Sequence, residues 1–154
     1  MSSRIVRPES SDGTGWLVYD HLAGVVLADP AAPDLLNGDQ YGLVAFYDLR
    51  TQVNSDGFAG YFSYAYGDDA PAALRMAGAL GAPGWHALIG DAVAFIGEPY
   101  PDDQAERSER MDELADESAF DAFDDRFYLL EADHQLDVIV DRYVWERHRS
   151  FFNV

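Results

Sequence analysis

Apolar residues in this chain recur at intervals of three and four positions, and glycine or proline interrupts the recurrence. An α-helix gathers such residues on one face, whereas a half-buried strand needs strict alternation of apolar and polar positions. Sustained alternation is absent from the sequence. The pattern therefore predicts an all-α fold, a compact multi-helix single domain of about seven or eight helices over residues 1–154.

The breaks also predict where the helices lie. Asp39 and Asp133 are the expected N-caps of their helices, and Ser118 with Asp121 three residues later resembles a capping pair. A short strand pair around residues 17–19 and 25–27 is the main alternative. The expected helices run approximately over residues 16–27, 39–53, 58–67, 70–81, 83–96, 102–117, 118–130 and 133–144.

The length and composition fit an ordinary globular protein. A chain of 154 residues with 48% hydrophobic residues can bury a core without disulfides or metals. The polar segment 1–12 lacks the apolar core of a secretory signal, and we expect it to be flexible. The apolar stretches are far shorter than the ~20 residues that span a bilayer. We therefore expect a cytoplasmic protein.

Acidic charge is the most unusual feature of the composition. The chain carries 28 acids against 10 arginines and no lysine, which gives a net charge of −18. More than half of this excess falls within residues 98–125, which hold 12 acids and two arginines. Such a field repels nucleic acid and anionic membranes and attracts basic proteins over roughly 8 Å at physiological salt. A uniform acidic coat that only maintains solubility is the alternative interpretation.

The acids of residues 102–117 are ordered as well as numerous. Five of them follow one another at steps of four and three positions, which places them on one helix face. These carboxylates rise by about 4.5–6 Å each, and duplex DNA has a phosphate every ~3.4 Å of axis per strand. Together with neighbours from adjacent helices, the row could imitate a phosphate track. The predicted partner-binding residues are Asp102, Asp103, Glu106, Glu109, Asp112, Glu113, Asp116, Glu117 and Asp121.

The sequence contains no recognisable catalytic or ligand-binding constellation. Cysteine is absent, which excludes disulfides, thiolate metal sites and thiol nucleophiles. The four histidines are far apart, and no phosphate-binding glycine loop is present. A calcium loop aligned on Gly57 fails, because Ser63 occupies the position of the last carboxylate ligand. We therefore expect a non-enzymatic protein without a cofactor or a metal.

The segment NSDGFAGYFSYAYGDDAP, residues 54–71, and a later block around residues 125–128 resemble the signature of the bacterial DNA-mimic protein nineteen family. The resemblance covers roughly residues 40–152. Asn54, Gly57, Phe58 and Tyr61 could line a pocket, but aromatic residues at helical spacing favour a helix start packed into the core. The matching positions, which we expect to be structural, are Asn54, Gly57, Phe58, Tyr61, Phe62, Gly67, Phe127 and Tyr128.

This resemblance implies an all-α homodimer whose acidic surface imitates duplex DNA and occupies a helix-turn-helix transcription factor in place of its operator. Individual mimic carboxylates do not transfer by motif, and Asp56 stands here where a small residue is common. We therefore expect a binding protein for a basic, DNA-binding partner such as a transcription factor. An immunity protein that neutralises a basic toxin or nuclease is the alternative, and an acidic housekeeping protein is the second alternative.

Overall fold

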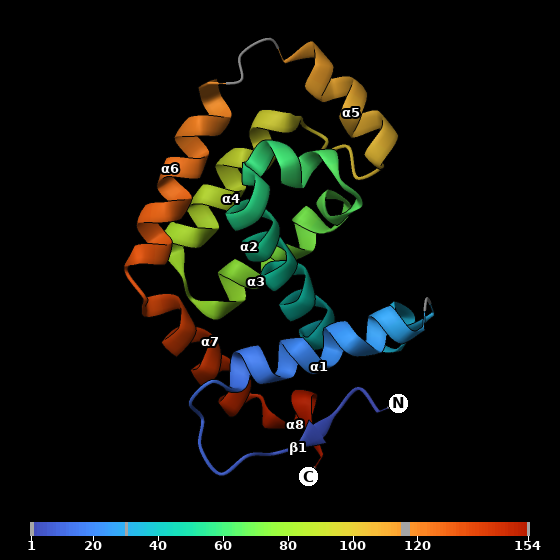
Figure 1. Cartoon of the computed structure of the whole chain (residues 1–154), viewed down its shortest axis with the longest axis vertical. Helices are drawn as coiled ribbons and strands as arrows, with labels where there is room; N and C mark the ends of the chain where they lie inside the picture. Colours follow the sequence, from blue (N-terminus) through green and yellow to red (C-terminus); the bar gives the residue numbers. More distant parts are fainter. Residues whose placement is uncertain (1, 30, 115–117, 154) are drawn as a thin grey trace.

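The computed structural model describes residues 2–29, 31–114 and 118–153, and these residues form an all-α structure, as predicted (Figure 1). The predicted number of helices is also confirmed, because the described residues contain eight α-helices together with two short 3-10 helices. The elements in chain order are β1 (Ile5–Val6), α1 (Thr14–Ala28), η1 (Ala32–Leu35), α2 (Gly38–Ser63), η2 (Ala65–Asp69), α3 (Ala70–Leu80), α4 (Pro83–Ile96), α5 (Gln104–Glu113), α6 (Ser118–Ala132), α7 (Gln135–Glu146), α8 (His148–Phe151) and β2 (Phe152–Asn153).

The two short strands lie at the ends of the chain. β1 pairs in parallel with β2, with Ile5 opposite Phe152, so the two termini lie side by side below α1 in Figure 1. The alternative strand pair around residues 17–19 and 25–27 is wrong, because both segments belong to α1. The sequence did not predict the terminal strands, since two residues are too few to establish an alternating pattern.

α1 is helical as predicted. Val18, Leu22 and Val25 point into the core, whereas the apolar residues Trp16 and Leu27 at the two ends of the predicted range are more than half exposed. The helix carries apolar side chains around most of its circumference, so its own sequence does not choose the buried face. The packing of α1 against α2 and α7 makes that choice.

α2 is the central helix, and it joins two of the predicted helices across a kink. Gly57, with φ +72° and ψ 177°, interrupts the helical backbone in a conformation that is essentially restricted to glycine. The N-cap is Asn37, which forms a capping box with Gln40, so the prediction of Asp39 as the cap is wrong. The helix predicted over residues 58–67 ends at Ser63, and the chain then continues as the 3-10 helix η2 from residue 65.

The remaining boundaries follow glycine and proline closely. Gly81 ends α3 with φ +73°, and Pro83 is the first residue of α4, as predicted. α5 ends at Glu113, earlier than the predicted residue 117, and residues 115–117 lie outside the described residues. α7 begins at Gln135 without a side-chain cap, so the expected cap by Asp133 is wrong. His134 precedes α7 with a left-handed backbone, which moves Asp133 one position too far away.

Aromatic side chains fill the core between α2, α4 and α6. Phe58, Phe62 and Phe127 are fully buried, and Phe127 lies edge-on to both Phe58 and Trp85. α3 packs against both α2 and α4, while α5 lies at the far end of the molecule from α1 (Figure 1). Among the described residues, no helix combines the length and the apolar character that crossing a lipid bilayer requires.

Candidate functional site

The acids of α5 and of the turn before it are exposed at one end of the molecule. Asp103 is the N-cap of α5, and its carboxylate accepts a hydrogen bond from the backbone amide of Glu106 at 3.2 Å. Asp116 and Glu117 lie outside the described residues, and Asp121 is exposed on α6. We use the term α5 acidic face for the exposed carboxylates of Asp102, Asp103, Glu106, Glu109, Asp112 and Glu113.

A buried arginine fastens α5 to the core. The side chain of Arg107 is fully buried at the C-terminal end of α2. Its guanidinium donates hydrogen bonds to the carbonyl oxygens of Phe62 at 2.6 Å, Tyr64 at 2.7 Å and Pro101 at 3.2 Å, and to the Asp68 carboxylate at 2.9 Å. A helix C-terminus attracts a cation, because its last carbonyls lack partners and carry partial negative charge.

Gly67 makes room for this guanidinium. A Cβ atom at Gly67 would lie 2.9 Å from Nε and Nη2 of Arg107, which is too close for a side chain. The carbonyl of Gly67 also accepts a hydrogen bond from the hydroxyl of Tyr100 at 2.5 Å. The glycine of the sequence signature therefore serves the attachment of α5.

The second arginine of α5, which is exposed, also reaches a helix end. Arg110 donates a hydrogen bond through Nε to the carbonyl of Ile96 at the end of α4, at 2.8 Å. Its Nη1 atom lies 3.2 Å from the carboxylate of Glu113. Both cations of α5 thus bind backbone carbonyls at helix ends, and most of the carboxylates of the α5 acidic face remain without a cationic partner among the described residues.

A groove of about 480 Å³ separates α5 from α6 and from the end of α2. Asp112 and Asp121, both predicted to bind a partner, line it from opposite sides, and Asp56 and Asp124 add two further carboxylates. The rest of the lining is largely apolar, formed by Ala59, Met111, Leu114 and Phe120 together with the small polar residues Ser63 and Ser108. The tertiary structure therefore extends the acidic surface beyond α5 alone. No three His, Asp or Glu side chains of the described ranges gather closely enough to hold a metal ion.

Asp124 connects this groove to the kink in α2. Its carboxylate accepts a hydrogen bond at 2.8 Å from the amide of Phe58, the first residue after Gly57. Burial raises the pKa of the Asp124 carboxyl, neighbouring Asp121 and Asp125 act in the same direction, and the bond from Phe58 opposes them. A Cβ at Gly57 would lie 2.6 Å from an oxygen of this carboxylate, so glycine is needed here for space as well as for backbone conformation.

The signature residues divide between the core and the surface. Phe58, Tyr61, Phe62 and Phe127 are fully buried, which agrees with their interpretation as helix residues packed into the core. Tyr128 is half exposed. Asn54 is exposed and lines a pocket, so the pocket hypothesis holds for this residue and not for its buried neighbours.

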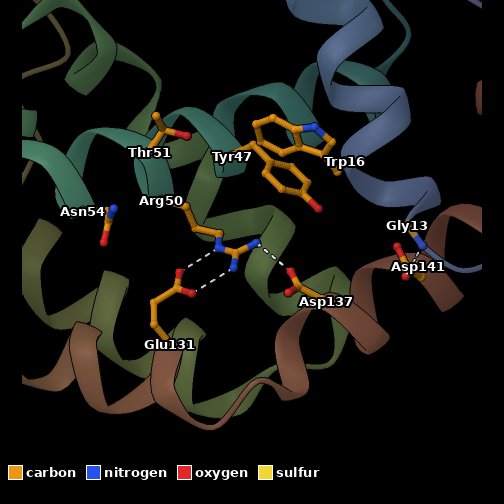
Figure 2. A pocket seen from close by; sticks show the side chains of 9 residues that line it. All are labelled: Gly13, Trp16, Tyr47, Arg50, Thr51, Asn54, Glu131, Asp137 and Asp141. Carbon is orange, nitrogen blue, oxygen red and sulfur yellow. Dashed lines mark hydrogen bonds and ion pairs between the residues drawn. The ribbon is translucent and has the colours of Figure 1, made fainter.

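That pocket is a second candidate site, and it measures about 590 Å³. It lies between α1, α2, the end of α6 and α7 (Figure 2), and its lining residues are Gly13, Trp16, Tyr47, Arg50, Thr51, Asn54, Glu131, Asp137 and Asp141. Arg50 donates two hydrogen bonds to Glu131, at 2.7 and 2.9 Å, and one to Asp137 at 3.1 Å. Unlike the arginines of α5, which donate mainly to backbone carbonyls, this arginine donates only to carboxylates among the hydrogen bonds of the described residues.

The N-terminus of α1 forms another wall of the pocket. Asp141 accepts hydrogen bonds from the backbone amides of Gly13 at 2.8 Å and Gly15 at 2.9 Å, and so caps α1 from α7. Burial raises the pKa of the Tyr47 hydroxyl well above its ordinary value, so this group keeps its proton at neutral pH. Sequence reasoning missed the pocket because its residues come from four separate segments.

A comparison with known protein families agrees with the sequence signature. The family model described as DMP19-like protein matches residues 34–147, which is more than half of the chain and lies close to the range 40–152 of the resemblance. No curated protein matches the sequence, and no solved structure matches it. The match includes α2 with its kink at Gly57, α5 with Arg107, and α6. The chain therefore belongs to the DMP19-like protein family.

Proposed function

We propose that this protein binds a basic, DNA-binding protein in place of duplex DNA, through the α5 acidic face and the adjoining groove. Membership of the DMP19-like family supports DNA mimicry as the type of role. The proposed partner is a basic protein such as a transcription factor, and the proposed activity is binding rather than catalysis.

One observation carries the proposal. Arg107 and Arg110 are the only cations of α5, and both direct their guanidinium groups to backbone carbonyls beneath the helix. Arg110 also pairs with Glu113, but the other five carboxylates of the α5 acidic face have no cationic partner among the described residues. These carboxylates therefore stand as a row with little interleaved positive charge, which is the electrostatic character of a nucleic acid backbone.

The groove beside α5 supports the same role, because it offers a place for a basic side chain of the partner. Its lining combines carboxylates from α2, α5 and α6 with the apolar side chains of Met111, Leu114 and Phe120. A basic side chain that enters it could place its alkyl stem on Met111 or Leu114 and its charge near Asp112 or Asp121. Charge complementarity of this kind chiefly determines the association rate and the specificity, and it weakens with salt.

The test compares two variants of equal charge. In the first, Glu106→Arg, Glu109→Arg and Glu113→Arg are combined on α5. The matched control combines Glu9→Arg, Asp20→Arg and Asp34→Arg, three exposed positions in the part of the chain before α2 that make no ion pair among the described residues. Wild type and both variants are used to capture partners from the native lysate, and the partners are then identified and titrated at several salt concentrations.

We expect the α5 variant to lose the partner and the control to keep it. The captured protein should be basic, duplex DNA should displace it, and its affinity should fall steeply as salt rises. Equal loss in both variants would indicate a general effect of net charge and would contradict the proposal, as would a partner that duplex DNA does not displace. A captured toxin or nuclease in place of a regulator would favour the immunity role.

A further inference from the structure

The pocket beside α1 has features that the proposed DNA-mimic role does not use. Its lining residues come from α1, α2, α6 and α7 and none from α5, and its volume of about 590 Å³ falls within the range of small-ligand sites. Three observations, on charge, on a tyrosine hydroxyl and on an exposed indole, bear on what it could hold.

The charge of the pocket favours a cation. Arg50 faces three carboxylates, those of Glu131, Asp137 and Asp141, which leaves two negative charges in excess. The two bonds to Glu131 engage the guanidinium of Arg50 most fully, and only one oxygen of Asp137 receives a bond from it. The side chain of Asp137 is 65% exposed, so its second oxygen is open to a ligand. An anion would meet repulsion here.

The hydroxyl of a largely buried tyrosine borders the same space. Tyr47 is only 4% exposed, and its hydroxyl forms no hydrogen bond among the described residues. Figure 2 shows this hydroxyl directed toward the side of the pocket where Asp137 and Asp141 lie. The oxygen is open to the pocket, because it is not one of the fully buried polar atoms that lack a partner, and it can therefore bond to a ligand group.

Gly15 lets Tyr47 and α7 pack closely against the start of α1. A Cβ atom there would lie 2.5 Å from Cγ1 of Val140, 2.8 Å from the hydroxyl oxygen of Tyr47 and 3.2 Å from Oδ1 of Asp141, so there is room only for glycine. The hydroxyl of Tyr47 and the carboxylate of Asp141 therefore both lie close to Gly15 at the start of α1. Each has a lone pair to offer to an N–H donor.

The indole of Trp16 forms another wall of the pocket. This ring is 56% exposed, and its centroid lies 6.0 Å from that of Tyr47 in an edge-on arrangement. An exposed indole face attracts cations, and planar guanidinium groups in particular. The pocket already contains one such arrangement, because the guanidinium carbon of Arg50 lies 5.4 Å from the centre of the Tyr47 ring.

We propose that this pocket binds a guanidinium group, with Trp16 as the stacking surface, Asp137 and Asp141 as the counter-charge, and the Tyr47 hydroxyl as a hydrogen-bond acceptor. The group belongs either to a small molecule or to an arginine side chain of a protein. The site is independent of the α5 acidic face, so either proposal stands if the other fails.

Methylguanidinium is the first probe, titrated into the whole protein at physiological salt and followed by amide and indole chemical shifts in NMR spectra. We expect saturable shifts at Gly13, Trp16 and neighbouring amides. Tyr47→Phe removes only the unpaired hydroxyl, and Trp16→Leu removes an exposed ring, so both variants should fold. Each should weaken binding about fivefold or more, whereas Tyr128→Phe, on a half-exposed ring outside the pocket, should leave it unchanged.

Further titrations identify the chemical group that the pocket prefers and the kind of molecule that carries it. Methylammonium, of equal charge, should bind at least about fivefold more weakly, because it lacks the planar face and the paired donors. A short peptide containing arginine that shifts the same amides with higher affinity than methylguanidinium would indicate a protein ligand; otherwise the ligand is a small molecule. The α5 triple variant should bind methylguanidinium as wild type does.

The proposal would be overturned by an absence of saturable shifts, or by equal affinities for wild type, Tyr47→Phe and Trp16→Leu. The second result would indicate diffuse attraction to an acidic protein. Equal binding of methylammonium would also reject the guanidinium assignment.

Discussion

The two candidate sites differ in what their arginines chiefly bind. At α5, Arg107 and Arg110 donate mainly to backbone carbonyls at the ends of α2 and α4, and Glu113 is the one carboxylate of the α5 acidic face with a cationic partner among the described residues. At the pocket, Arg50 binds Glu131 and Asp137 directly, and Asp141 is engaged by the amides of α1. The α5 acidic face therefore keeps most of its charge for a partner, whereas the pocket keeps only the excess that Arg50 leaves. This difference can be tested through stability.

The largest effect is expected at Arg107. Arg107→Met should lower the free energy of unfolding by about 3–5 kcal/mol, because it leaves buried carbonyls and Asp68 without their donor. Arg110→Met, on the same helix with a side chain 45% exposed, should cost about 1 kcal/mol. Urea unfolding measures both changes, and hydrogen exchange should locate the loss at α5. Equal stability of the two variants would contradict the proposal that Arg107 attaches α5 to the core.

At the pocket the cost should be smaller and partly reversible. Arg50→Met should lower the free energy of unfolding by about 1–3 kcal/mol, since it leaves Glu131 and Asp137 unpaired in partly solvated positions. Adding Glu131→Gln should recover part of this loss, because an unpaired charge is removed. Adding Asp68→Asn to Arg107→Met should recover little, because carbonyls are the main acceptors there. Similar recovery in both double variants, measured by urea unfolding, would remove the distinction between the regions.

Asp48 differs from the acids of both candidate sites, because it is largely buried and forms no ion pair among the described residues. Its carboxylate accepts a hydrogen bond from Tyr19 at 2.7 Å, and burial raises its pKa to about 6. The folded protein therefore holds this proton more tightly than the unfolded chain, so the contribution of Asp48 to stability falls as pH rises from about 4 to above 6.

Asp48→Asn should raise the free energy of unfolding by about 1–2 kcal/mol at pH 7.5 and have little effect at pH 4. The amide oxygen can still accept the hydrogen bond from Tyr19. Thermal unfolding of wild type and variant across this pH range is the measurement. A gain of the same size at pH 4 would show that the charge of Asp48 is not the cause.

The smallest effect is expected on the α5 acidic face. Combining Glu106→Gln, Glu109→Gln and Glu113→Gln should leave the free energy of unfolding within about 0.5 kcal/mol of wild type, because these solvated carboxylates repel one another and support no buried contact. Glu131→Gln alone should be the more destabilising change. If the triple variant proved strongly destabilised in urea, the acids of α5 would be structural and not available for a partner.

Local sequence patterns predicted most of the fold and one of the two candidate sites. Helix ends at Gly81 and Pro83 were predictable because glycine and proline act on the backbone within one or two residues. Asp39 and Asp133 were wrong caps because a better cap at Asn37 and a left-handed residue at His134 shift each helix start. The acids of α5 share a face because helical spacing alone places them there.

The sequence by itself determined the all-α class, the family and the row of acids, because each depends on residues that are near neighbours along the chain or on a helix. The tertiary structure alone decided which side of α1 is buried, where the arginines of α5 point, and that Tyr47 and Asp141 border one pocket. These features depend on contacts between helices distant in sequence, and no local period encodes such contacts.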